Sequence, residues 1–118
     1  MLDSGKGILE KAKLGGYCIP QFNVNNLEWA KTILEVANNL KTPVILGVSE
    51  GAIDYMGGYN TVVGMVNGLI EDLNIIIPVI LHLDHGSSIE FCKKAIDSGF
   101  SSVMIDASSF NIEKNIEI

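Results

Sequence analysis

Apolar positions along the chain follow two different periods in turn, and this alternation predicts the order of helices and strands. Apolar residues spaced three and four apart predict helices, because those positions share one helix face. Unbroken apolar runs predict strands that are buried on both sides, as in parallel sheets. The predicted helices are Ser4–Leu14, Leu27–Leu40, Tyr59–Leu73, Ile89–Ser98 and Asn111–Ile118, and the predicted strands are Tyr17–Phe22, Pro43–Val48, Ile76–Leu83 and Ser102–Ile105.

Polar and glycine-containing segments separate these elements. Pro20 weakens the first strand, because proline cannot donate a hydrogen bond to a neighbouring strand. Asn23–Asn26 has the composition of a turn, and Ser49–Gly58 is expected to be a loop with about one helical turn. The residues expected to cap or end helices are Ser4, Ser87 or Ser88, Gly15-Gly16 and Gly99.

Strands that alternate with amphipathic helices indicate βα units and a parallel sheet, so the fold class is α/β. Periodicity alone leaves open whether the sheet is a doubly wound open sheet or part of a closed barrel. No linker, low-complexity segment or run of like charges interrupts the pattern, so residues 1–118 are expected to form one domain.

Composition excludes several classes of protein. The 47% of hydrophobic residues excludes a disordered segment. The net charge is −6, and all eight basic residues are lysines. An acidic chain without the bidentate guanidinium of arginine is a poor candidate for binding nucleic acid or an anionic membrane surface.

Features of targeting and redox chemistry favour a cytoplasmic protein. The first 30 residues lack a basic start followed by an apolar run, so no secretion signal is expected. Cys18 and Cys92 have no metal-binding spacing and are interpreted as reduced thiols. The longest apolar run, Ile75–Leu83, is far shorter than the roughly 20 residues of a membrane span and contains Pro78 and His82.

Polar side chains follow each predicted strand at its carboxyl end. They are Asn23, Ser49-Glu50, the segment His82–His85, and Asp106. Because the carboxyl ends of parallel strands meet at one edge of the sheet, a functional site is expected there. Asn and Ser are also common helix caps and turn residues, so a structural role for Asn23 and Ser49 is at least as well supported.

The segment His82-Leu83-Asp84-His85-Gly86 contains both histidines of the chain. An imidazole beside a carboxylate suits either metal binding or acid–base catalysis. A catalytic zinc site needs three protein ligands, and this chain offers His85, with Asp84 or Asp106 as further candidates. The glycine pairs match neither the GxGxxG nor the P-loop pattern, so no phosphate-binding glycine loop is expected.

Four segments together resemble the amino-terminal part of class II, zinc-dependent fructose-bisphosphate aldolases. The resemblance extends in order over essentially the whole chain. The related tagatose-bisphosphate aldolases share much of the pattern. The four segments are Gln21–Asn26, Pro43–Gly51, His82–Gly86 and Ser102–Ser108.

The resemblance implies a fold, a reaction and a metal. Parallel βα units would form the first half of a TIM (β/α)8 barrel. The reaction would be reversible cleavage of fructose 1,6-bisphosphate, a phosphorylated sugar, to dihydroxyacetone phosphate and glyceraldehyde 3-phosphate. Zinc bound by the oxygens of the dihydroxyacetone phosphate half would act as a Lewis acid and spread the charge of the carbanion into an enediolate. No Schiff-base lysine is required.

Residue roles also follow from the resemblance. Asp84 matches the catalytic proton donor, and His85 matches one of three zinc-binding histidines. Asp106 matches a ligand of a second divalent metal position. Ser49 and Asn23 match substrate-binding positions. His82 belongs to the motif with a supporting role, behind the metal ligands.

The chain also departs from the family pattern. Ser109-Phe110-Asn111 stands where many relatives have paired histidines and a proline. A closed barrel of eight strands takes roughly 250 residues, and four strands are predicted here. The two other zinc histidines and the later phosphate-binding loops are missing, so the chain alone is expected to be inactive. Full-length relatives are expected to be homo-oligomers.

Three alternatives remain at this point. The chain resembles a tagatose-bisphosphate aldolase fragment nearly as well. A non-catalytic, flavodoxin-like α/β binding domain would have Asp84 and Asp106 as ordinary acidic strand-end residues. A non-catalytic partner that completes a barrel with another chain is the third.

Overall fold

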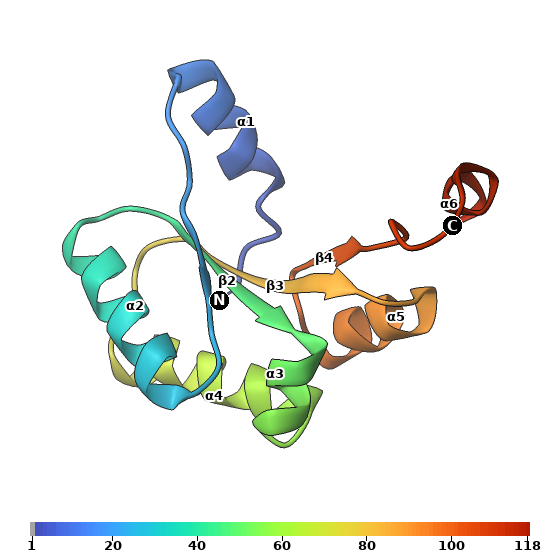
Figure 1. The fold of residues 1–118 in the computed structure, drawn as a ribbon. Coiled ribbons are helices and arrows are strands. Elements are labelled where there is room, and N and C mark those ends of the chain that lie inside the picture. Colours follow the sequence, from blue (N-terminus) through green and yellow to red (C-terminus); the bar gives the residue numbers. More distant parts are fainter. Residues whose placement is uncertain (1) are drawn as a thin grey trace.

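A computed structural model describes residues 2–118 as six helices around a four-stranded sheet (Figure 1). The strands are β1 (Gln21–Asn23), β2 (Val44–Ser49), β3 (Val79–Gly86) and β4 (Ser102–Ile105). The helices are α1 (Lys6–Gly15), α2 (Leu27–Asn39), α3 (Glu50–Tyr55), α4 (Tyr59–Asp72), α5 (Ile89–Ser98) and α6 (Ile112–Glu117).

The four strands are all parallel and lie in the order β1-β2-β3-β4. The predicted α/β class and parallel sheet are therefore confirmed. Each strand pairs with the next one along the chain, as in an arc of a barrel. A doubly wound, flavodoxin-like sheet would instead reverse its strand order at a switch point. The sequential order therefore excludes that alternative.

The core lies on one face of the sheet. Paired residues of β2 and β3, such as Leu46 with Leu81 and Val48 with Leu83, point to this face and are fully buried. Burial of each such side chain stabilises the fold by about 1.5–3 kcal/mol. Four helices cover them (Figure 1), and their buried residues are Ala30, Leu34 and Ala37 of α2, Ala52 and Ile53 of α3, Tyr59, Val62, Val66 and Ile70 of α4, and Cys92 and Ala95 of α5.

The opposite face of the sheet, called the open face below, carries polar side chains toward its carboxyl edge. By register, Asn23 and His82 flank Gly47 in one row, and Ser49 pairs with Asp84 in the next row. The helix α1 lies on this side (Figure 1), where Gly5 packs against Ile80 at the other end of the strands. The fold therefore separates an apolar core from a polar face that ends at the predicted functional edge.

Three strands differ from their predicted bounds, because each begins directly after a proline that the prediction had included. Pro20 contributes only its carbonyl, which accepts from the backbone N–H of Ile45, so β1 begins at Gln21 and extends through Asn23. The predicted turn at Asn23 is thus one residue too early. Pro78 likewise delays β3 to Val79, and Ile76 lies outside the strand with 83% of its surface exposed.

Helix boundaries follow the expected caps with two exceptions. The prediction that Ser4 caps α1 is wrong: the capping position is Gly5, at φ +80°, and the Asp3 carboxylate accepts its N–H at 2.7 Å. The helical turn expected in the loop after Ser49 is present but longer, as the six-residue helix α3, which Ser49 Oγ caps by accepting the N–H of Ala52. The confirmed caps and ends are Ser88, Gly16 and Gly99.

The helices of residues 2–118 are short or polar, and none has the length and hydrophobicity needed to span a membrane.

Candidate functional site

An irregular pairing of β3 with β4 lies at the centre of the site. Leu83 pairs with Val103 and Gly86 pairs with Ile105, so two residues of β3, Asp84 and His85, face a single residue of β4. This is a β-bulge, which bends a strand and redirects its side chains. His85 takes a left-handed backbone conformation there, with φ +56°. Histidine adopts that conformation more readily than most non-glycine residues.

The bulge brings the side chains of Asp84 and His85 to the same site. Successive residues of a regular strand point to opposite faces, and the extra residue breaks that rule. Asp84 Oδ1 lies 3.8 Å from His85 Nε2. The Asp84 side chain is 21% exposed and the His85 side chain 60%, so both reach solvent at the carboxyl edge. The sequence predicted this pair together, and the structure places it so.

Asp106 holds the His85 ring from the other side. His85 Nδ1 lies 2.8 Å from Asp106 Oδ2, and the N–H of Ser108 donates to Asp106 Oδ1 at 2.9 Å. Hydrogen bonds from Ser108 and His85 lower the pKa of Asp106 to about 2. The hydrogen bond to Asp106 and the nearby charge of Asp84 raise the pKa of His85. The ionised carboxylate only accepts, so Nδ1 carries the proton and Nε2 faces Asp84.

His82 lies one row behind this group on the open face. Its Nδ1 hydrogen-bonds with Ser102 Oγ at 2.8 Å and so joins β3 to β4. Burial lowers the pKa of His82, which favours its neutral form. A neutral ring behind the site agrees with the supporting role that the resemblance implies for His82. That role stays a prediction.

The two predicted substrate-binding residues lie farther along the open face. Ser49 pairs with Asp84 in the sheet register, and its hydroxyl also caps α3. Asn23 is the exposed last residue of β1, two strands away from Asp84. The structure therefore brings Asp84, His85 and Asp106 together, places Ser49 beside them, and leaves Asn23 apart.

Glu50 is a site residue to which the sequence analysis gave no role. Its carboxylate accepts two hydrogen bonds from Ser87, one from the backbone N–H and one from the hydroxyl. Its position directly after Ser49, at a strand end, was the only available signal. The contact spans 37 residues, so sequence spacing gave no hint of it.

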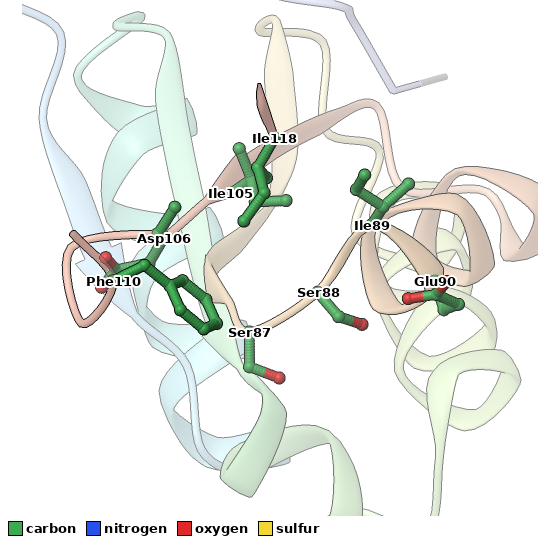
Figure 2. Close-up of a pocket in the computed structure, with 9 residues that line it drawn as sticks. Ser87, Ser88, Ile89, Glu90, Ile105, Asp106, Phe110 and Ile118 are labelled. Carbon is green, nitrogen blue, oxygen red and sulfur yellow. The ribbon is translucent and has the colours of Figure 1, made fainter. Parts of the chain in front are cut away.

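A small cavity of 190 Å³ lies next to Asp106 (Figure 2). Ser87 and Ser88 line it from the segment before α5, and Asp106 and Phe110 line it from the segment after β4. Phe110 stands where many relatives were expected to carry a histidine. The lining therefore places the aromatic ring of Phe110 near the Asp106 carboxylate.

The donor atoms at this edge fit one position of a zinc site. An imidazole held at Nδ1 by a carboxylate leaves Nε2 free as a ligand, which is a common arrangement around zinc. Both Asp106 oxygens already accept hydrogen bonds, so its role as a metal ligand stays a prediction. Within residues 2–118 no group of three His, Cys, Asp or Glu side chains that would hold a metal ion is found. A metal held through His85 Nε2 would therefore find no complete set of ligands among the described residues.

The His85–Asp106 pair predicts a pH dependence of stability. The pKa of Asp106 is lower in the folded state than in the unfolded chain, so its contribution is present above about pH 4 and is lost toward about pH 2. The pKa of His85 is raised, so its contribution is present below about pH 6.5 and is lost at higher pH. Urea midpoints of wild type and Asp106→Asn should differ most near pH 5. An equal difference near pH 9 would contradict this assignment.

Replacement of Gly86, at the end of the bulge, by alanine tests how tightly the site is packed. A Cβ on Gly86 would lie 2.8 Å from Cys92 Sγ, 2.9 Å from Leu83 Cδ2 and 3.1 Å from the Met104 carbonyl. We expect Gly86→Ala to destabilise the fold by about 1–3 kcal/mol in urea denaturation. Gly68→Ala, in α4 with no atom within 4 Å of the new Cβ, is the matched control and should stabilise by up to about 1 kcal/mol. Equal effects would contradict tight packing at Gly86.

Comparisons with known proteins agree on one family. The family model described as "Fructose-bisphosphate aldolase class-II" matches residues 3–118. Over 117 residues the chain is 61% identical to the fructose-bisphosphate aldolase of Geobacillus stearothermophilus and 60% identical to that of Staphylococcus epidermidis. Each alignment covers 99% of this chain and 41% of the relative. The chain therefore spans less than half the length of these relatives.

A solved structure supports the same comparison. The crystal structure of the YdjI aldolase from Escherichia coli K12 superimposes with a TM-score of 0.88 at 32% sequence identity. The match covers 99% of this chain and 44% of that one. The four βα units thus correspond to part of a TIM-barrel aldolase, as the resemblance implied.

Proposed function

Because the chain belongs to the class II fructose-bisphosphate aldolase family, we propose that it contributes the proton-transfer residue and one zinc ligand of a zinc-dependent aldolase. We propose further that residues 1–118 form the amino-terminal half of the barrel domain. The substrate would be fructose 1,6-bisphosphate, and the products dihydroxyacetone phosphate and glyceraldehyde 3-phosphate. The relatives are named fructose-bisphosphate aldolases. The residues present in this chain decide which steps of that reaction the chain could contribute to.

The observation that carries the proposal is the placement of Asp84 and His85 by the bulge. A carboxylate for proton transfer must lie beside the group that stabilises the new charge. Asp84 Oδ1 and His85 Nε2 are 3.8 Å apart at the open edge of the sheet. A regular strand would have turned these two side chains to opposite faces.

Each residue has a defined task in this proposal. The Asp84 carboxylate takes the proton of the C4 hydroxyl as the C3–C4 bond breaks, and C4 becomes the aldehyde carbon. The electron pair of the broken bond stays on C3, beside the C2 carbonyl. Ser49, paired with Asp84 across β2 and β3, would contact the glyceraldehyde 3-phosphate half.

His85 would hold the metal through Nε2, while Asp106 keeps the ring oriented through Nδ1. When bound, zinc supplies the Lewis-acid charge that favours a carbanion beside a carbonyl. Other ligands would have to join His85, because a catalytic zinc has three protein ligands.

A chimaera tests the proposal. Residues 1–118 replace the matching segment of the Geobacillus stearothermophilus enzyme, which is 61% identical. We expect the zinc-loaded chimaera to cleave fructose 1,6-bisphosphate and to lose activity when a chelator removes the metal. A folded, zinc-loaded chimaera without cleavage would refute the proposal. Faster cleavage of tagatose 1,6-bisphosphate would favour the related substrate instead.

The 118-residue chain alone should show no cleavage with added zinc. One imidazole ligand also implies weak zinc binding by calorimetry. Turnover by the chain alone, or nanomolar zinc affinity, would mean that additional ligands are supplied by residues not assigned above.

A further inference from the structure

Glu50 joins two strand-end segments through both oxygens of its carboxylate. The Ser87 N–H donates to Oε1 at 2.6 Å, and the Ser87 hydroxyl donates to Oε2 at 3.0 Å. Glu50 is the first residue of α3, directly after β2, and Ser87 directly follows Gly86, the last residue of β3. This contact, called the Glu50–Ser87 tie below, joins the end of β2 to the end of β3.

The tie lies where the sheet is least regular. At Asp84 and His85 the regular pairing of β3 with β4 is interrupted, and His85 has a left-handed backbone. Two contacts fix the chain just beyond the bulge. On the β4 side the Asp106 N–H donates to the Gly86 carbonyl at 2.8 Å, and on the β2 side Ser87 donates to Glu50.

We infer that Glu50 is a positioning residue that holds the bulge, and with it the relative placement of the Asp84 and His85 side chains. Only the use of that placement in proton transfer rests on the proposed function. A carboxylate can accept hydrogen bonds through both of its oxygens, and this one accepts two from a single residue. In Figure 2 the Ser87 hydroxyl points away from Ile105 and Ile118, and it donates to Glu50 Oε2.

A simpler role for Glu50 would be to stabilise the start of its helix. Acidic residues in a first turn interact favourably with the helix dipole. Glu28 is likewise in the first turn of its helix, as the second residue of α2, and is exposed on the surface. The variant Glu28→Ala therefore removes a helix-start carboxylate without removing the tie, and it is the matched control for Glu50→Ala.

Hydrogen exchange measured by mass spectrometry tests the inference on the 118-residue chain. We expect Glu50→Ala to speed exchange on the order of tenfold to a hundredfold in residues 84–88 and 106–108, with core peptides of β2 and α4 unchanged. Glu50→Gln, which keeps a carbonyl acceptor for the Ser87 N–H, should restore most of the protection. Glu28→Ala should match wild type in these segments.

A second readout reports on the site itself. The ring resonances of His85 should shift in Glu50→Ala, while those of His82, fixed to Ser102, stay in place. If Glu50→Ala does not fold, Ser87→Ala removes only the hydroxyl contact and should give a smaller increase in the same segments.

Several results would overturn the inference. These are no change in residues 84–88, a uniform increase over all peptides, complete exchange of 84–88 in wild type at the shortest time, or an equal effect of Glu28→Ala. The same holds if neither Glu50→Ala nor Ser87→Ala alters these segments. None of the readouts uses activity, so an inactive chimaera and a missing tie are separate outcomes.

Discussion

Asp84→Asn is expected to lower kcat for fructose 1,6-bisphosphate cleavage about 10²- to 10⁴-fold in the chimaera, the usual range for loss of a positioned acid or base. Asparagine keeps the size of the side chain and one acceptor oxygen, but it cannot take the C4 hydroxyl proton. The fold should therefore persist, and zinc content should remain near that of the unmodified chimaera. Steady-state kinetics with metal analysis measures both effects.

The control for this substitution is Asp72→Asn, an identical change at the exposed last residue of α4. It should leave kcat within about twofold, as expected of a surface position. A loss of less than about tenfold in Asp84→Asn would remove Asp84 from the proton-transfer step. An equal loss in both variants would indicate a general effect of charge.

His85→Ala is expected to lower the zinc affinity of the chimaera by more than about 100-fold. The expected loss exceeds the 10- to 100-fold typical of residues that only orient a ligand. Asp106→Asn should give the smaller effect, because Asp106 contacts Nδ1 of His85. Competition with a chromogenic chelator measures both affinities. If Asp106→Asn weakens zinc as much as His85→Ala does, Asp106 is itself a ligand.

His82→Ala is the matched control for His85→Ala. Both residues are histidines of β3, three positions apart, but His82 bonds to Ser102 behind the site. Its replacement should weaken zinc binding by no more than the roughly 10- to 100-fold typical of supporting residues, because it removes no expected ligand. A loss comparable to that of His85→Ala would contradict the assignment of His85 as the ligand in this segment.

Most of the fold follows from the sequence because its signals are local. The buried runs around Leu46 and Leu81 read directly as parallel strands, and Ser88 and Gly99 mark the ends of α5. The errors arise where one local signal competes with another. At the start of α1, the Asp3 carboxylate displaced the expected Ser4 cap. At β3, Pro78 moved the strand start toward the carboxyl end.

The site was predicted only in part, because its geometry depends on non-local pairing. The sequence grouped Asp84 with His85 and placed Asp106 at the same edge. The bulge that aligns them arises from a register shift between β3 and β4. No residue type in the sequence predicts such a shift. The contact of Glu50 with Ser87 could not be predicted from the sequence either, because it also depends on how the strands pair. A sequence predicts which residues are neighbours along the chain. Contacts between strands can be predicted only when the pairing register is known.

The sequential strand order has a consequence for how the protein is made. Each strand finds its partner in the unit synthesised just before it, so no strand waits for a distant segment to emerge. Pairing in sequential order keeps the sequence separation between partner strands smaller than a reordered parallel sheet would, so less loop entropy is lost at each step. This order allows successive βα units to dock during translation. Asp84 and His85 would then leave the ribosome after β2, the strand with which β3 pairs, has already formed.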